Sequence, residues 1–212
     1  GSGGGGIRMQ SAADFNLITQ STMSGGGGGT GGGGNPNGTP GAGASVIQAA
    51  SNEIVSSFVQ GSTAVFVSGS TGTVVDSSRL AGTGSSGVGL GWTGGGVGLS
   101  AASNVVGGGI EGKGILLEGG GSGLIRLSTN TILAGSKYGV YVGTQAGGAQ
   151  LWLTSNTVVS NNVSAVDAYG IYLDGLRSGA TIQNNGVFFR SSGGMAAMVR
   201  SAFYARTSSG VV

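Results

Sequence analysis

The sequence contains no cysteine and no histidine, and it has only two prolines among its 212 residues. Without cysteine or histidine, the chain can form no disulfide and no thiolate nucleophile, and it has no imidazole for acid–base catalysis or metal binding. Two prolines beside 50 glycines also exclude a collagen-like triple helix, which needs abundant proline and a glycine at every third position. These absences remove disulfide scaffolds, zinc sites and collagen from the candidate classes.

Charged residues are also scarce, at 8% of the sequence against about 25% in an average soluble domain. The net charge is only +2, so nothing in the sequence marks a basic, nucleic-acid-binding surface. Ser, Thr, Asn, Gln and Gly must cover most of the surface instead, and the weak charge repulsion that results favours self-association. No run of 18 apolar residues is present, so we expect no transmembrane helix.

A repeat becomes visible through the tetrapeptide AASN, which occurs at 49–52 and again at 101–104. Ser78 lies halfway between the two copies, and polar residues continue after the second copy at steps of 26, 26 and 29 residues. The flanking positions three before and two after each of these residues are apolar. Asn suits such a turn because it tolerates the left-handed conformation and can form hydrogen bonds along a stack. The predicted structural turn column consists of Asn52, Ser78, Asn104, Asn130, Asn156 and Asn185.

Short apolar segments lie between these polar residues, including GVGLG, GILLEG, GVYVG and GIYLDG. Each segment alternates apolar residues over three to five positions and is bounded by glycine, which is typical of a strand, and no helical periodicity is sustained. A unit of 26 residues is too long for hexapeptide coils and too short for propeller blades, and it lacks the leucine-rich consensus. The sequence therefore predicts an all-β parallel β-helix (solenoid) with about 26 residues per coil and roughly seven coils.

The segments YGVYVG…LWLTSNTVVSNN and YGIYLDG…ATIQNNGVFF resemble the repeats of right-handed parallel β-helix proteins with the pectate-lyase-like fold. The resemblance covers residues 97–190 well, and GIYL…ATIQNN is similar to the non-enzymatic branch found in bacterial cell-surface proteins. It implies the fold more firmly than an activity. Enzymatic members of this fold cleave acidic polysaccharides with clustered Asp and calcium, or hydrolyse glycosides with paired carboxylates.

The repeat divides the chain into three predicted parts. Residues 1–23 form an N-terminal segment with a candidate first rung in DFNLITQ, 24–45 form a Gly-rich low-complexity insertion, and 46–212 form the β-helix. We expect the chain, which starts with GSGGGG, to be a mature product, an excised fragment or a tagged chain. Its last residues read as an incomplete repeat, so we expect either further chain or another molecule at that end.

Candidate site residues are the aromatic side chains predicted to point outward, namely Tyr141, Trp152 and Tyr172. Such side chains can stack on each other and stabilise adjacent coils, bind a partner protein, or stack on sugar rings. Regular threonine columns would indicate ice binding, but only Thr131 and Thr157 align.

The acidic residues are isolated in the sequence. The nearest approach to a catalytic pair is Glu118 and Asp174, predicted to lie two coils and about 9.6 Å apart with Gly143 between them. We therefore expect that the chain is not an enzyme and has no catalytic residue, metal site or cofactor.

Taken together, these features predict a non-enzymatic extracellular or cell-surface β-solenoid with a structural or adhesive role, as part of a bacterial surface layer, filament or appendage. The expected partners are further copies of the chain or another structural protein of a larger assembly, and a surface glycan is a second candidate. The alternatives are a carbohydrate-binding or depolymerising β-helix, such as a phage tailspike or polysaccharide lyase, a host-directed adhesin, and an ice-binding solenoid. Neither nucleic acid nor a transmembrane segment is expected.

Overall fold

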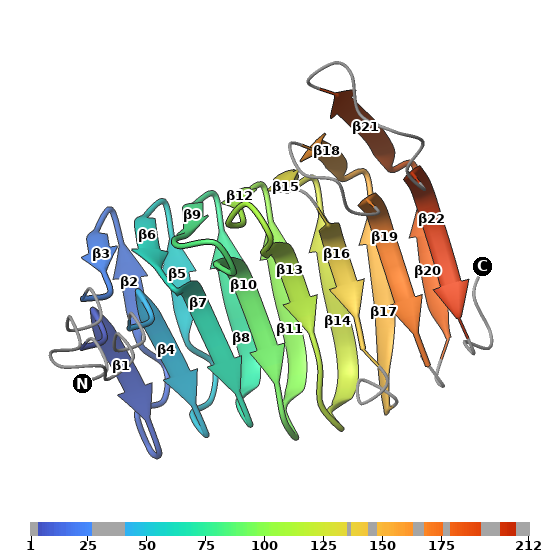
Figure 1. Cartoon of the computed structure of the whole chain (residues 1–212). Helices are drawn as coiled ribbons and strands as arrows, with labels where there is room; N and C mark the ends of the chain where they lie inside the picture. The colour runs from blue at the N-terminus through green and yellow to red at the C-terminus, as the bar shows by residue number, and fades with distance from the viewer. Residues whose placement is uncertain are drawn as a thin grey trace, which may run out of the picture.

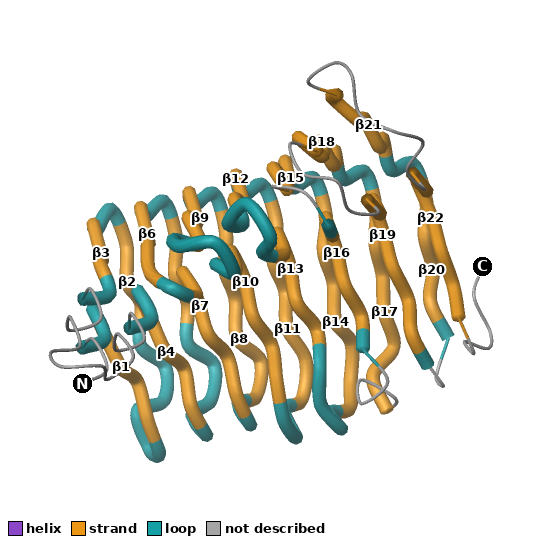
Figure 2. Tube along the Cα trace, viewed as in Figure 1, coloured by secondary structure: helices purple, strands orange, loops and turns teal. Residues whose placement is uncertain are grey.

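Three parallel β-sheets surround one long axis, and successive coils of the chain stack along that axis (Figure 1). The computed structural model describes residues 4–26, 41–134, 137–143, 148–162, 168–175, 179–191 and 200–206. These residues form 22 strands joined by loops, and no helix occurs among them (Figure 2). Every coil contributes one strand to each sheet, so β1–β21 make seven coils and β22 begins another. The predicted parallel β-helix with roughly seven coils is therefore confirmed.

The eight strands of sheet A are β1 (Ile7–Gln10), β4 (Ala44–Ile47), β7 (Thr63–Ser68), β10 (Val88–Thr93), β13 (Lys113–Leu117), β16 (Tyr138–Val142), β19 (Ala168–Asp174) and β22 (Arg200–Arg206). The seven strands of sheet B are β2 (Leu17–Thr19), β5 (Glu53–Val55), β8 (Thr71–Asp76), β11 (Val97–Ala102), β14 (Ser122–Ser128), β17 (Gly148–Thr154) and β20 (Ala180–Gln183). The seven strands of sheet C are β3 (Thr22–Ser24), β6 (Phe58–Gly61), β9 (Arg79–Gly82), β12 (Val105–Gly107), β15 (Thr131–Ala134), β18 (Thr157–Asn162) and β21 (Gly186–Ser191).

Alternate residues of each strand point inward and stack into aliphatic columns. In sheet B, Leu127 of β14 pairs with Leu153 of β17, and both side chains are almost completely buried. Fully burying a side chain of this size contributes about 1.5–3 kcal/mol. Because one coil alone has no inner face to bury, this stabilisation exists only when coils stack, as in other solenoids.

Buried asparagines form a hydrogen-bonded column at the corner between sheets B and C. The Asn104 main-chain N–H and its Nδ2 both donate to Asn130 Oδ1 at 3.0 Å, and Asn130 bonds to Asn156 in the same way. Asn156 in turn donates to Asn185. The left-handed residue is the one before each asparagine, such as Thr129 with φ 54°, and not the asparagine itself as we expected. The asparagines therefore serve as hydrogen-bonding groups that join successive coils.

The assignment of Asn52 to the predicted turn column is wrong. Asn52 accepts hydrogen bonds from Asn16 at the corner between sheets A and B, where it precedes β5. Ser57 occupies the predicted position, since its main-chain N–H donates to Ser78 Oγ, and Ser78 continues the column to Asn104. The step from Ser57 to Ser78 is only 21 residues, so a constant period of 26 selects the wrong residue. The two AASN segments are thus corners of different kinds.

Glycine recurs at the corner where sheet C leads into sheet A because the chain passes close to another side chain there. A Cβ atom on Gly139 would overlap the side chain of Val158, and one on Gly114 would overlap Ile132. This close approach explains the glycine that precedes the apolar pair in GVYVG and in the equivalent segments.

The N-terminal strands β1–β3 belong to the same three sheets as the rest of the chain. Most of the Gly-rich segment 24–45 lies outside the described residues, between Gly26 and Gly41. The domain boundaries of the sequence analysis therefore stay predictions.

Candidate functional site

Tyrosines form two adjoining columns on the outer face of sheet A. Tyr141, Tyr172 and Tyr204 are register partners on β16, β19 and β22, with ring centroids 5.4 and 5.0 Å apart and nearly parallel planes. Tyr138 and Tyr169 form the second column, stacked at 5.6 Å. Edge contacts of 4.9–5.1 Å join the two columns. We call the outer surface of these five residues the tyrosine face.

Lysine side chains lie over the rings near the start of these strands. Lys113 Nζ is 5.3 Å from the ring centroid of Tyr141, and Lys137 Nζ is 5.3 Å from that of Tyr138. A cation at this distance is attracted by the negative face of the ring. The contacts hold both ammonium groups at one edge of the tyrosine face.

Carboxylates occupy the opposite edge. Glu118 directly follows β13, and Asp174 is the last residue of β19. Burial raises the pKa of the Tyr141 hydroxyl above its ordinary value, and the negative charges of Asp174 and then Glu118 raise it further. Gly143 leaves room for the Glu118 side chain, because a Cβ on this glycine would lie 2.9 Å from Glu118 Cγ. The Glu118 side chain therefore occupies the space over Gly143, the residue that lies between the two acids.

Trp152 lies on a different sheet from the two predicted tyrosines. It is an outward residue of β17 in sheet B, 40% exposed, and its register partners are Arg126 and Thr181. The Arg126 guanidinium lies 5.1 Å from the Trp152 ring centroid. The structure therefore brings Tyr141 and Tyr172 together but places Trp152 on a separate surface.

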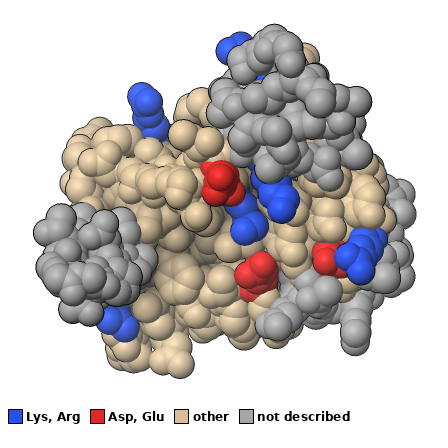
Figure 3. Space-filling model, in the orientation of Figure 1, with Lys and Arg blue, Asp and Glu red and all other residues tan. Residues whose placement is uncertain are grey.

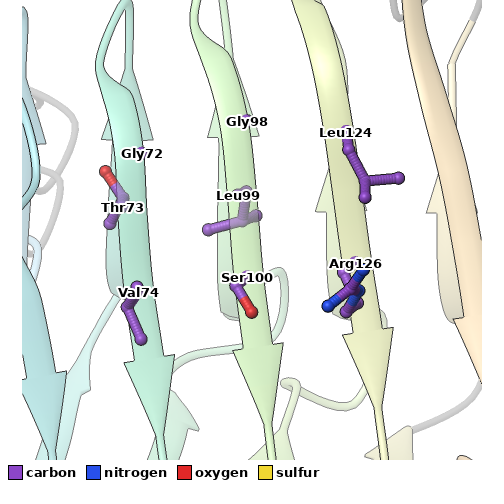
Figure 4. Close-up of a pocket in the computed structure, with 8 residues that line it drawn as sticks. All are labelled: Gly72, Thr73, Val74, Gly98, Leu99, Ser100, Leu124 and Arg126. Carbon is purple, nitrogen blue, oxygen red and sulfur yellow. The ribbon is translucent and has the colours of Figure 1, made fainter.

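A shallow hollow of about 230 Å³ adjoins this Arg–Trp pair on sheet B (Figure 4). It spans β8, β11 and β14, and its lining consists of Gly72, Thr73, Val74, Gly98, Leu99, Ser100, Leu124 and Arg126. Gly72 and Gly98 have φ values of 61° and 77°, a conformation that other residues rarely adopt. Because neither residue has a side chain, they help to deepen the hollow. Arg126 belongs both to the hollow and to the pair with Trp152, so the two features form one continuous surface.

We call this surface the sheet B track. It runs across the strands, from the hollow over β8 and β11 through Leu124 and Arg126 of β14 to Gln150 and Trp152 of β17. Thr181 of β20 is next to Trp152. The track combines an exposed aromatic ring, one cation, uncharged polar groups and an apolar wall.

Sequence reasoning missed Tyr138, Tyr169 and Tyr204 as members of the tyrosine face. The signal for two of them was present, because YGVY and YGIY place a second tyrosine three residues before the predicted one. The sequence held a signal for the hollow that our prediction did not use, because Gly72 and Gly98 are one 26-residue repeat apart and so fall on adjacent strands. Within the described residues, no group of three His, Cys, Asp or Glu side chains could hold a metal ion. No helix long and apolar enough to cross a membrane occurs in the described part of the chain.

No family model matches the chain, and no curated protein sequence matches it. Its fold is similar to the crystal structure of a mutant DFA-IIIase from Arthrobacter chlorophenolicus A6 in complex with DFA-III, at 10% sequence identity and a TM-score of 0.36. The match covers 90% of this chain and 57% of that one, so the chain spans little more than half the length of the matched protein.

The stacked parallel sheets define the chain as a parallel β-helix protein. The prediction that it is not an enzyme is contradicted by the match, because the matched structure is that of an enzyme. We therefore withdraw the exclusion of catalysis. At 10% identity the likeness concerns the fold alone, and it assigns neither a catalytic residue nor a substrate to this chain.

Proposed function

We propose that this β-helix is an extracellular or cell-surface adhesive protein that binds a glycan chain along the sheet B track. The observation that carries the proposal is the hollow over β8, β11 and β14, which opens beside the exposed Arg126–Trp152 pair. The chemistry of this surface suits glycan recognition, and the surface differs from the tyrosine face in offering an open depression.

Sugar rings have apolar C–H faces and hydroxyl edges, and the track offers partners for both. An exposed tryptophan supplies a flat apolar surface with a large contact area. Arg126, Ser100 and Gln150 supply hydrogen-bonding groups around it, and a guanidinium can donate several hydrogen bonds from one plane. Binding sites for small molecules typically combine an apolar surface with a few such polar groups.

The dimensions of the track suit a chain better than a free monosaccharide. Ligand clefts usually measure about 300–1,000 Å³. The hollow, at about 230 Å³, is smaller than this and holds about one ring-sized group. From β8 to β20 the track crosses five strands of sheet B, a length of about 19 Å at about 4.8 Å per strand. A polymer lying parallel to the solenoid axis would contact the hollow and Trp152 together.

A glycan array followed by titration of any positive oligosaccharide tests the proposal. We expect Trp152→Ala to weaken binding at least about tenfold, because it removes the stacking surface, and Ser100→Trp to weaken it by obstructing the hollow. Phe188→Ala is the matched control, since Phe188 is an aromatic residue of sheet C with 57% exposure. Equal losses for Phe188→Ala and Trp152→Ala, or no bound glycan at all, would reject the sheet B track.

An assay for newly released reducing ends on each bound glycan separates binding from cleavage. Release that persists in Trp152→Ala would move the function to another surface of the protein. Binding without release would support the adhesive role.

A further inference from the structure

We infer that the tyrosine face of sheet A is the interface of a face-to-face homodimer whose two-fold axis runs parallel to the solenoid axis. This inference concerns a different sheet from the glycan track and does not depend on it. It follows from the aromatic packing, the charge distribution and the size of the face.

The aromatic packing determines what the tyrosine face offers a partner. Stacked neighbours cover the ring faces within each column, with Tyr141, Tyr172 and Tyr204 at centroid distances of 5.0–5.4 Å. The columns therefore present ring edges and hydroxyl groups to a partner and leave little ring face for a sugar. Tyrosine is enriched at protein interfaces because it combines a large, rigid contact area with a polar tip.

The charges on this sheet differ between its two edges. The edge where β13 and β16 begin carries two lysines and one glutamate, which together give one net positive charge. These residues are Lys113, Lys137 and Glu111. The other edge carries two acids and one arginine, which together give one net negative charge. These residues are Glu118, Asp174 and Arg206. Figure 3 shows basic and acidic side chains on this side of the molecule with uncharged surface between them.

Only one orientation of the two-fold axis brings opposite charges together. A two-fold axis along the strands would place the positive edges of the two copies against each other. An axis parallel to the solenoid axis exchanges the two ends of every strand, so Lys113 of one copy faces Glu118 of the other. Both residues belong to the same coil, at either end of β13. A two-fold interface is self-complementary by construction, so this pair occurs twice.

The same rotation places some tyrosines of one copy opposite acids of the other copy, and other tyrosines opposite tyrosines. Tyr169 lies three positions before Tyr172 on β19, and Asp174 lies two positions after it. Rotation about an axis over Tyr172 therefore places the Tyr169 hydroxyl of each copy near the Asp174 carboxylate of the other. The central column of each copy then packs against its own counterpart.

The area of the face predicts a weak dimer. The tyrosine face and the two preceding strands of sheet A, β10 and β13, make five strands with about five residues each, which cover roughly 24 Å by 17 Å, or about 400 Å² per copy. Stable complexes bury about 800 Å² per partner. We therefore expect association at high protein concentration that stops at the dimer.

Sedimentation velocity of the whole chain over a wide concentration range, with a charge-swap series, tests this arrangement. Lys113→Glu alone places two glutamates opposite each other, and Glu118→Lys alone places two lysines opposite each other, so each should weaken dimerisation at least about tenfold. An equimolar mixture of the two single variants should form a heterodimer, because both contacts in the mixed pair are then attractive. Arg79→Glu is the control: it also replaces a positive by a negative charge, but on sheet C, and it should leave the dimer intact.

The heterodimer identifies this axis, since among the face-to-face two-fold arrangements of sheet A considered above only this one pairs residue 113 with residue 118 across the interface. The inference is overturned if the wild type stays monomeric throughout, if it forms oligomers that grow beyond two copies, or if the mixture associates no better than the separate variants. Loss of the dimer in Arg79→Glu would also overturn it. Far-UV circular dichroism checks that each variant is folded.

Discussion

Asn130 offers the sharpest test of how the coils are held together. Its Oδ1 accepts hydrogen bonds from the main-chain N–H and Nδ2 of Asn104, and its Nδ2 donates to the Ala101 carbonyl and to Asn156 Oδ1. The residue is almost completely buried. Asn130→Ala would leave the Asn104 N–H without an acceptor in a place that water does not reach.

The cost can be worked out from these contacts. A buried polar group left without its partner costs about 1–3 kcal/mol, and the lost hydrogen bonds and the small cavity add to this. We expect Asn130→Ala to lower the free energy of unfolding by about 2–4 kcal/mol, which is a large part of the about 5–15 kcal/mol of a typical protein. Asn130→Ser should cost about half as much, because in an earlier coil Ser78 Oγ accepts the Ser57 N–H at 3.0 Å.

Urea unfolding followed by far-UV circular dichroism measures both values, and Thr131→Ala is the control because Thr131 is an outward neighbour on β15. Native-state hydrogen exchange should show faster exchange at the Asn104 amide in Asn130→Ala than in the wild type. The reasoning fails if Asn130→Ala costs no more than Thr131→Ala, or if the serine and alanine variants are equally destabilised.

Three further changes test the core, a corner and the tyrosine face. Leu153→Asp places a carboxylate among buried aliphatic side chains and should destabilise the protein by more than about 3 kcal/mol, seen as a lower melting temperature. Gly139→Ala should cost about 1–3 kcal/mol because its Cβ overlaps the Val158 side chain and the Gly170 carbonyl oxygen. Adding Val158→Ala should recover only the part of the loss that comes from Val158, in a double-mutant cycle. The folded-state pKa of Tyr141 lies above its ordinary value of 10.0, so its contribution to stability is fully present below pH 10 and is lost as the pH rises through the folded-state pKa. Glu118→Gln should lower that pKa, which absorbance titration of the phenolate would detect; an unchanged or higher value would contradict the charge effect.

The later coils were predictable because their corners keep a constant spacing and a single residue type. From Ser78 to Asn156 the steps are all 26 residues, and the same hydrogen bonds recur at each step. The earlier coils were not, because the step from Ser57 to Ser78 has 21 residues and serine takes the place of asparagine. A hydroxyl can accept the same main-chain N–H as a carboxamide oxygen, so the physical role persists while the sequence signal disappears.

The site was predicted only at the level of which side chains point outward. Period-2 alternation places Tyr141, Tyr172 and Trp152 on the outside, and all three are at least partly exposed. Alternation alone does not say which sheet carries each residue. The repeat does separate them, because Trp152 lies just before the corner at Asn156 and the tyrosines lie in the segments between the corners. The hollow depends on Gly72 and Gly98, which lie one 26-residue repeat apart in sequence and so on adjacent strands.

The proposed dimer and the proposed glycan track have a joint consequence. A two-fold axis parallel to the solenoid axis leaves both copies pointing in the same direction, so their sheet B tracks run parallel and carry Trp152 at the same height. The same axis turns the two tracks to face opposite directions, because sheet B runs along the solenoid axis. A dimer can therefore join two glycan chains but cannot place both of its sites on one flat surface. Lys113→Glu should reduce the cross-linking of a soluble glycan polymer, measured by turbidity, while leaving the affinity for a short oligosaccharide unchanged. A loss of oligosaccharide affinity would mean that residue 113 acts on the track itself, and unchanged cross-linking would mean that the dimer does not join glycan chains.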